Sequence, residues 1–276
     1  MKKFENVIIA SDMDGTFITA DPVGMARNRE QIAYFKENGG HFTFATGRTY
    51  QSVIQAAPDV AELVNAPVVV FNGACLYDFQ QRKELENRPL PFAPLRELIE
   101  RMEASGLPFG CRMTTGDKHL FYSLEHSMTA QDFDALSARG ETCLLLPLEE
   151  WARYPLYRMT VRSEDETRRE LIERFADAFR DRLTMVPSEP TMMDVQDATV
   201  HKAVVLRDMV ARYYDRPMFL CAVGDYNNDA EMLKSADLSC CPDNALDEIK
   251  AICHHTLCHK DRGVVGDVID LLDTMF

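Results

Sequence analysis

Near the start of the chain stand ten residues that join an apolar run to two acids, Val7-Ile8-Ile9-Ala10-Ser11-Asp12-Met13-Asp14-Gly15-Thr16. The β-branched run predicts a buried strand, and in open parallel sheets ligands bind outside the carboxyl ends of such strands. Asp12 and Asp14 would point the same way on a continuing extended backbone, and Gly15 permits a turn directly after them. This pattern suits a carboxylate nucleophile beside a proton donor, although taken alone it also fits a simple Asp-Gly turn.

A second predicted strand, residues 41–45, ends in Thr46-Gly47-Arg48. A hydroxyl group and exposed backbone N–H groups can donate to a tetrahedral oxyanion, and glycine permits its close approach. Thr46 or Thr49 would instead cap the helix expected at 50–57. Arg48 either binds a substrate phosphate or pairs with an acid of the core.

The first part of the chain alternates strands and helices. A helix expected at 25–38 follows the acidic turn, and a third strand, 67–71, is closed by Asn72-Gly73-Ala74. This order predicts a parallel sheet with right-handed crossovers. Asn72 is interpreted first as a residue of a turn or of the wall of the ligand site. The alternative is that Asn72 and Gly73 contact the substrate.

The character of the sequence changes at about residue 85. Pro89, Pro91 and Pro94 mark a linker, and a second proline-marked passage, Pro187-Ser188-Glu189-Pro190, is expected to return the chain to the first domain. Between them we expect helices at 95–104, 130–138 and 164–179 and strands at 109–114, 119–123 and 157–162. The prediction is a doubly wound, Rossmann-like α/β core, 1–84 and 191–276, with an α+β cap domain inserted at 85–190.

The last segment resumes the α/β rhythm. A helix is expected at 201–213, and a buried strand at 217–223 runs into Gly224-Asp225-Tyr226-Asn227-Asn228-Asp229. Acids therefore follow a strand for a second time. Lys202, at the start of the helix, would by itself be read as solvent-exposed.

Composition limits the possible partners. The 276 residues are 46% apolar and 27% charged, as in ordinary globular proteins, with a net charge of −14 at pH 7. Such an acidic chain is a poor match for nucleic acid or an anionic membrane, but local cations and a metal allow a small phosphorylated metabolite to bind. Because no apolar run approaches about 20 residues and residues 1–6 lack a signal-peptide core, we expect a cytoplasmic protein.

The eight cysteines include no C-x-x-C pair and are expected to be mostly small buried side chains in a reducing compartment. His254, His255, Cys258 and His259 form a denser cluster. Without a second Cys/His group at a usual spacing, this cluster is interpreted as structural rather than as a zinc site.

Taken together and in order, the motifs resemble the haloacid dehalogenase-like hydrolase superfamily, in particular its Cof-type branch with a large α+β cap. The pieces that carry the resemblance are 12–16, 45–48, 72–74, Lys202, 224–229, 242–245 and 263–265. One departure is His201, where relatives more often have a small residue.

The resemblance implies a Mg²⁺-dependent phosphatase acting on small phosphate monoesters such as sugar phosphates or phosphorylated cofactors. Asp12 would be the nucleophile that forms an aspartyl-phosphate, and Asp14 the general acid and base. The implied Mg²⁺ ligands are the Asp12 carboxylate, the Asp14 carbonyl and Asp225. The phosphoryl group would be bound by Thr46, Gly47, Lys202 and Asn228. Asp229 would support the metal site or Lys202. The residues considered for contact with the rest of the substrate are Arg48, Asn72, Gly73, Asn244 and the cap residue Arg158.

Two other functions remain open. A phosphomutase of the same superfamily would also use an aspartyl-phosphate. Mutases generally carry their insertion between the first acidic motif and the Thr motif, and the 29 residues between Thr16 and Thr46, enough for one helix and a strand, disfavour a mutase. A non-catalytic sensor of phosphorylated metabolites would keep the fold, although such a degenerate site should lack an acid, and none is missing. Arg158 has its own alternative, a place on the solvated face of the cap.

Overall fold

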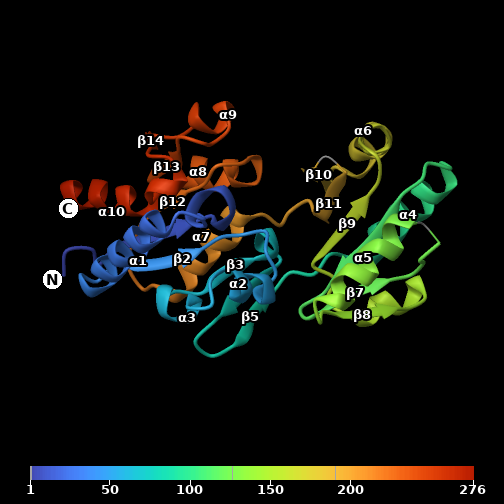
Figure 1. Cartoon of the computed structure of the whole chain (residues 1–276), viewed down its shortest axis with the longest axis horizontal. Helices are drawn as coiled ribbons and strands as arrows, with labels where there is room; N and C mark the ends of the chain where they lie inside the picture. Colours follow the sequence, from blue (N-terminus) through green and yellow to red (C-terminus); the bar gives the residue numbers. More distant parts are fainter. Residues whose placement is uncertain (1, 126, 190) are drawn as a thin grey trace. The chain divides into compact units, whose positions relative to one another are not determined.

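The computed structural model describes residues 2–125, 127–189 and 191–276 and contains two compact units (Figure 1). The first unit comprises Met1–Glu86 and His201–Phe276, and the second comprises Asn87–Val200. The second unit is thus inserted into the sequence of the first.

A parallel five-stranded sheet, in the order β14-β13-β12-β1-β2, forms the centre of the first unit. The strand bounds are Val7–Ser11 for β1, His41–Phe44 for β2, Phe219–Val223 for β12, Leu238–Pro242 for β13 and His255–Leu257 for β14. Every side chain of β1 is buried, which explains its continuous apolar run. Since Ser11 pairs with both Val223 and Phe44, β1 ends level with its two neighbours, and the residues that follow them meet at one edge.

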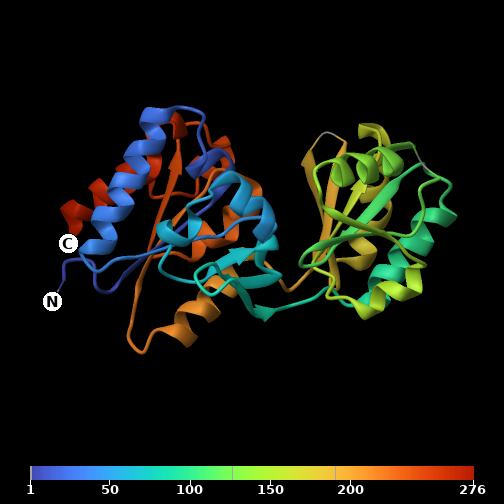
Figure 2. The same cartoon turned by 60° about the horizontal axis from the view of Figure 1, so that its bottom comes forward.

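Helices cover both faces of this sheet (Figures 1 and 2). Two of them, α1 (Pro22–Glu37) and α10 (Val264–Met275), pack against each other and against β2 and β13, respectively. On the face formed by Ile8 and Ala10 pack α7 (Lys202–Tyr213) and α8 (Ala230–Ser235). Three shorter helices are α2 (Tyr50–Ala56), α3 (Val60–Leu63) and α9 (Asp247–Lys250). The predicted doubly wound α/β core is confirmed.

No helix in the described parts of the chain has both the length and the apolar character needed to cross a membrane.

Side-chain caps fix the starts of two helices. The first helix begins at Pro22, earlier than the predicted residue 25, because Asp21 Oδ1 accepts hydrogen bonds from the backbone N–H groups of Val23 (2.8 Å) and Gly24 (3.0 Å). At α2, Thr49 Oγ1 accepts from the Ser52 N–H at 3.0 Å. Of the two candidate caps, Thr49 therefore fills this role.

The third predicted strand is only marginally part of the parallel sheet. It is β3 (Val68–Val70), which is joined to the sheet by a single bridge between Ala45 and Val69. Positive φ angles at Phe71 (51°), Asn72 (53°) and Gly73 (112°) then reverse the chain. As a result β3 pairs with β4 (Cys75–Asp78), and β5 (Lys83–Asn87) completes a separate three-stranded sheet.

The second unit is built on a mixed sheet in the order β10-β11-β9-β6-β7-β8. Its strands are β6 (Gly110–Thr114), β7 (Lys118–Phe121), β8 (Thr142–Leu145), β9 (Arg158–Arg162), β10 (Leu183–Glu189) and β11 (Met192–Asp197). Apolar residues of α4 (Phe92–Ala104) and α6 (Asp165–Phe179) form one core with one face of the sheet. On the opposite face lies α5 (Ser127–Ala138), where a Cβ at Gly110 would come within 2.0 Å of Thr129 Oγ1.

The return to the first unit comes later than predicted. The passage Pro187–Pro190 was expected to lead back to the core, yet β10 runs to Glu189, β11 pairs with both β10 and β9, and the second unit continues to Val200. Pro190 itself lies outside the described residues. The prolines were misleading because this strand pair tolerates Pro187 next to a register shift.

Candidate active site

Two strand ends bring acids together in the first unit. Asp12 follows β1, and its N–H donates to the Val223 carbonyl of β12 at 2.8 Å, so Asp12 and Asp225 start from adjacent strands. Gly15 has a φ of +76°, and a Cβ there would lie 2.1 Å from Asp225 Oδ2. A glycine is therefore required both by the turn and by its close approach to Asp225.

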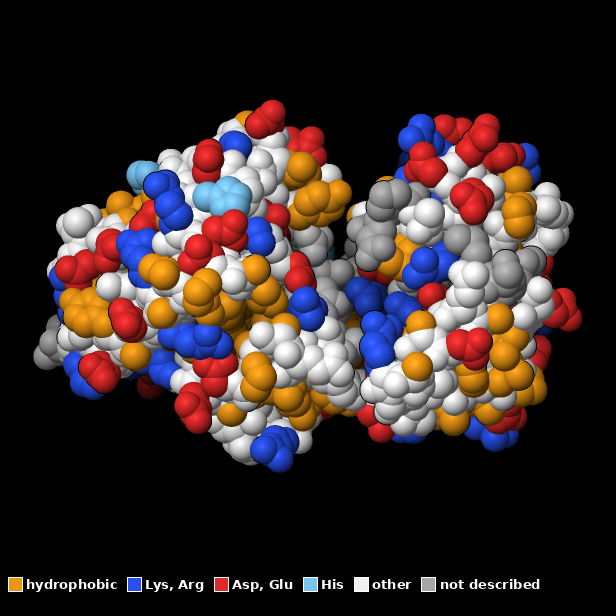
Figure 3. All heavy atoms as spheres, viewed as in Figure 1, with side chains coloured by type: hydrophobic (Ala, Val, Ile, Leu, Met, Phe, Trp, Pro, Cys, Tyr) orange, Lys and Arg blue, Asp and Glu red, His pale blue; other side chains and the backbone are white. Residues whose placement is uncertain are grey.

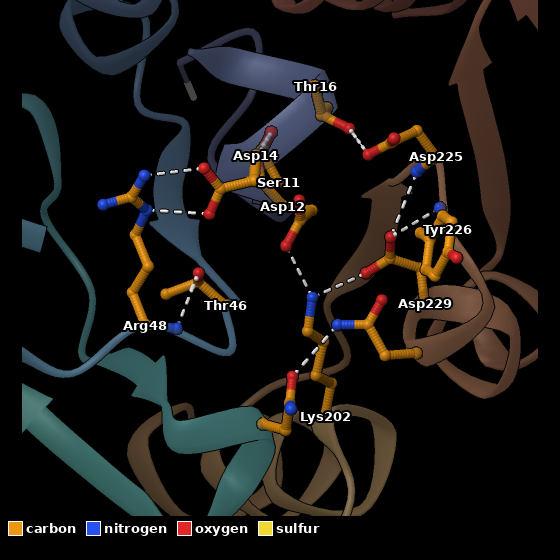
Figure 4. A network of polar contacts seen from close by, with 12 residues as sticks. Ser11, Asp12, Asp14, Thr16, Thr46, Arg48, Lys202, Asp225, Tyr226 and Asp229 are labelled. Carbon is orange, nitrogen blue, oxygen red and sulfur yellow. Dashed lines mark hydrogen bonds and ion pairs between the residues drawn. The ribbon is translucent and has the colours of Figure 1, made fainter. Parts of the chain in front are cut away.

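Lys202 lies buried between two carboxylates (Figure 4). Its Nζ donates to Asp12 Oδ1 at 2.6 Å and to Asp229 Oδ1 at 2.7 Å, and the side chains of the three residues are at most 7% exposed. The prediction that Lys202, taken by itself, is solvent-exposed is wrong. Helix α7 packs on the buried face of the sheet, and its first residue, Lys202, reaches the strand ends.

Asp229 is held by contacts at both carboxylate oxygens. Besides the contact with Lys202, its Oδ2 accepts from the backbone N–H groups of Asp225 (3.0 Å) and Tyr226 (3.1 Å). This carboxylate therefore fixes both the position of Lys202 and the turn that presents Asp225.

Asp12, Asp225 and Asp229 can each offer a ligand atom within 4.8 Å of the others. We call these three residues the carboxylate group. Burial raises the pKa of Asp12 well above its usual range, with Asp229 and Asp225 adding to the effect, although Lys202 opposes it. Burial also raises the pKa of Asp225 to about 6, against the effect of the hydrogen bond from Thr16. One ammonium does not balance three crowded carboxylates, so the group fits a divalent cation that prefers oxygen ligands.

The Asp14 side chain has a different partner from that of Asp12. Arg48 binds it with two parallel hydrogen bonds, from Nε to Oδ2 and from Nη2 to Oδ1, both 2.7 Å long (Figure 4). Arg48 Nη1 also donates to Ser52 Oγ at 2.8 Å. Of the two interpretations of Arg48, the structure therefore shows the ion pair with an acid. This acid is Asp14, whose side chain is 59% exposed.

The candidate phosphate-binding residues lie near this network. Thr46 is fully buried, and its Oγ1 accepts from the Arg48 N–H at 3.1 Å. A Cβ at Gly47 would be 2.9 Å from Asn72 Oδ1, which also accepts from Asn228 Nδ2 at 3.0 Å. The turns after β2, β3 and β12 therefore meet through Gly47, Asn72 and Asn228.

Other candidate residues have structural contacts. Asn244 Nδ2 donates to the Gly15 carbonyl at 2.8 Å, and its Oδ1 accepts from the Lys260 N–H at 3.0 Å, so Asn244 braces the acidic turn. Gly73 has a φ of +112° and lies against the backbone of His201, where a Cβ would be 2.9 Å from the carbonyl oxygen. Arg158 belongs to the second unit.

The His/Cys cluster makes contacts with its surroundings. His254 Nδ1 accepts from the Ser239 N–H at 3.0 Å, and the Cys258 N–H donates to Asp267 Oδ2 at 3.1 Å. Within the described residues, the cluster does not form a group able to share a metal ion.

Sequence reasoning missed the role of Thr16. Its hydroxyl donates to Asp225 Oδ1 at 2.8 Å and so links the two acidic turns. The signal was its place directly after Gly15 in the acidic motif, which the turn brings next to the second strand end.

The chain as a whole is similar to known proteins. Residues 9–269 match the haloacid dehalogenase-like hydrolase family, and the chain belongs to that family. The sequence-based assignment to a phosphatase of this kind is confirmed.

Two curated relatives are similar to this chain over nearly their whole length. One is the 5-amino-6-(5-phospho-D-ribitylamino)uracil phosphatase YitU of Bacillus subtilis, 24% identical with 94% of each chain covered. The other is the phosphatase YbjI of Escherichia coli, with the same named substrate, 25% identical over 95% of this chain and 94% of the relative. Among solved structures, a haloacid dehalogenase-like hydrolase from Bacteroides thetaiotaomicron shares the fold, with a TM-score of 0.77, 16% identity and coverage of 96% of this chain and 99% of that chain.

The buried lysine yields a stability prediction. We expect Lys202→Met to lower the free energy of unfolding by about 3–5 kcal/mol, because it leaves Asp12 and Asp229 buried without their cation. Urea denaturation in metal-free buffer measures this change. The matched control is Lys234→Met, which removes an exposed ion pair with Glu231 and should cost less than about 1 kcal/mol. Equal losses in the two variants would contradict the account of Lys202.

Proposed function

We propose that this chain is a Mg²⁺-dependent phosphatase that hydrolyses small phosphate monoesters through an aspartyl-phosphate on Asp12. The observation that carries the proposal is the position of the Asp12 carboxylate. It is buried at the end of β1, fixed at one oxygen by Lys202 and grouped with Asp225 and Asp229. A carboxylate held in this way has a defined direction of attack, which is what nucleophilic catalysis requires.

The proposed reaction has two steps. In the first, an oxygen of Asp12 attacks phosphorus while the bond from phosphorus to the leaving oxygen breaks, and the carboxylic acid form of Asp14 gives that oxygen a proton. In the second, Asp14 takes a proton from water as the water oxygen attacks phosphorus, which releases inorganic phosphate and regenerates Asp12. The paired hydrogen bonds from Arg48 occupy both oxygens of Asp14, so Asp14 must release Arg48 before it can give a proton to the leaving oxygen.

The other residues would position the phosphoryl group. Lys202, the hydroxyl of Thr46, the backbone at Gly47 and the amide of Asn228 are the proposed donors to its oxygens. Mg²⁺ held by Asp12, the carbonyl of Asp14 and Asp225 would neutralise charge between the nucleophile and the dianionic substrate. Asp229 would support Lys202 and the turn that carries Asp225, as its contacts indicate.

The proposed substrates are small phosphorylated metabolites. YitU and YbjI are named for a phosphorylated ribitylaminouracil, and a pyridoxal phosphate phosphatase of Escherichia coli, YbhA, is 30% identical over 95 residues of this chain. These two compounds belong in the first substrate panel.

We propose that the second unit acts as a mobile cap that closes over the phosphoryl site and selects the leaving group. Residues near the two points where the chain crosses between the units would act as hinges.

A direct test of the nucleophile is Asp12→Asn. We expect turnover of a phosphate ester panel to fall on the order of 1,000-fold or more, because an amide is a poor nucleophile toward phosphorus. The control is Asp215→Asn, an exposed position, and circular dichroism verifies folding of both variants. If the folded Asp12→Asn protein retains activity within about tenfold of wild type, Asp12 is not the nucleophile.

Metal dependence gives a second test. Chelation should abolish phosphate release, Mg²⁺ should restore it, and Ca²⁺ should inhibit because its larger, more flexible coordination shell misplaces the attack. Asp225→Asn should raise the Mg²⁺ concentration needed for half-maximal activity by about tenfold or more. Full activity in chelator, with metal content measured as nil, would refute the proposed site.

A further inference from the structure

Two thiol groups contact each other near the edge of the five-stranded sheet in the first unit. Cys241 lies on β13, and Cys253 lies in the turn between α9 and the edge strand β14. The N–H of Cys253 donates to the Ile249 carbonyl at 3.2 Å, which ties the turn to the end of α9. The Cys253 thiol donates a hydrogen bond to the Cys241 sulfur, and both cysteines are free. Cys241 and Cys253 are called here the thiol pair.

The surroundings of the thiol pair favour a thiolate. The hydrogen bond from Cys253 lowers the pKa of Cys241 against the effect of burial. The Thr256 hydroxyl, 3.5 Å from the Cys241 sulfur, and the Lys250 ammonium lower this pKa further. The same hydrogen bond raises the pKa of Cys253. The pair therefore shares one proton between two sulfurs, and a thiolate, unlike a thiol, is a strong nucleophile.

One member of the thiol pair can be reached from solvent. Cys241 is fully buried, whereas Cys253 is partly exposed. The neighbours of Cys253, His254 and His255, are exposed, and Figure 3 shows His side chains at the surface of the first unit where β14 lies. An oxidant can therefore meet Cys253, with Cys241 behind it as the second thiol. Redox-sensing cysteines have this arrangement, an accessible sulfur next to a resolving thiol.

Other cysteines of the chain lack one of these two properties. Cys221 on β12 and Cys240 on β13 also form a hydrogen bond with each other, but both are fully buried. Cys143 on β8 is partly exposed, but its sulfur accepts a hydrogen bond from the Ser137 hydroxyl. These cysteines are internal comparisons for the thiol pair.

The segment between the two cysteines, residues 242–252, contacts both acidic turns. Asn244 Nδ2 donates to the Gly15 carbonyl at 2.8 Å, and the Leu246 N–H donates to the Asp225 carbonyl at 3.1 Å. A disulfide bond is much shorter than the separation of two hydrogen-bonded sulfurs. Formation of the bond would therefore draw Cys253 toward the end of β13 and displace the segment that holds these turns.

We propose that the thiol pair is a redox switch, in which a peroxide converts the two thiols to a disulfide and the disulfide lowers the activity of the neighbouring site. The formation of the bond depends on the thiol pair alone. The loss of activity rests on the proposed phosphatase function.

The reaction balances with hydrogen peroxide as the oxidant. The proton of Cys253 passes to Cys241, and the Cys253 thiolate attacks a peroxide oxygen, so that the O–O bond breaks and a sulfenic acid forms. The hydroxide that leaves takes the proton from Cys241. The Cys241 thiolate then attacks the Cys253 sulfur, the S–O bond breaks, and the second hydroxide takes a proton from solvent. Two thiols are thereby oxidised to a disulfide, and one peroxide is reduced to two waters.

Peptide mapping tests whether the bond forms. Wild type, Cys253→Ser and the control Cys143→Ser are treated with hydrogen peroxide, alkylated and digested with trypsin, and circular dichroism verifies their folding. We expect wild type and Cys143→Ser to yield peptides linked between positions 241 and 253, which dithiothreitol releases, and Cys253→Ser to yield none. Oxidation of wild type without this link, or links formed equally by other cysteines, would overturn the proposal.

Turnover tests the effect of the bond. We expect peroxide to lower hydrolysis of p-nitrophenyl phosphate by wild type and Cys143→Ser by about tenfold or more, because a misplacement of about 1 Å at a reacting group can cost on the order of 100-fold. Dithiothreitol should restore the activity. Untreated Cys253→Ser should remain within about twofold of wild type and should keep its activity in peroxide. An equal loss in Cys253→Ser, or a disulfide that leaves turnover unchanged, would refute the switch.

The two measurements separate this inference from the phosphatase function itself. If untreated wild type hydrolyses the ester but peroxide forms no bond between positions 241 and 253, the phosphatase function stands and the switch is refuted. If untreated wild type hydrolyses no ester, the phosphatase function fails, and peptide mapping still decides whether the thiol pair forms a disulfide.

Discussion

The buried ammonium of Lys202, held between Asp12 and Asp229, is the interaction on which the proposed active site depends. A charge taken out of water is tolerated only when it is paired, and here a single cation pairs with two carboxylates that come from different parts of the chain. The ends of β1 and β12 and the start of α7 must therefore come together before any of the three charges is satisfied. This requirement links the core fold to the position of Asp12, the proposed nucleophile.

The same contacts leave the site short of positive charge. Within the described residues Asp225 forms no ion pair with a lysine, and burial raises its pKa to about 6. A phosphate ester would add further negative charge at this point. A divalent cation would offset both charges, so we expect metal binding and substrate binding to favour each other.

The sequence predicted the core well because its signals are local. Apolar runs followed by acids, such as the one that ends at Asp12, indicated the strands and the edge of the sheet where these acids meet. Local patterns did not identify which side chains from distant parts of the chain pair with each other. The burial of Lys202 and the pairing of Arg48 with Asp14 depend on the packing of α7 and α2, which no local pattern reports.

Other differences have equally physical causes. The chain reversal after β3 depends on positive φ angles at Phe71 and Asn72, residue types that also occur in ordinary strands and turns. In the second unit, prolines near the β10–β11 pair indicated a linker where the chain forms a strand pair.

The most direct test of the central claim is to trap the phosphoryl group on the protein. Wild type is mixed with a ³²P-labelled substrate and Mg²⁺, quenched in acid within one turnover, and reduced with borohydride, which converts an aspartyl-phosphate to homoserine. We expect protein-bound label before reduction, homoserine at position 12 after it, and neither in Asp12→Asn. Label at another residue, or rapid turnover with no labelled protein at any quench time, would contradict it.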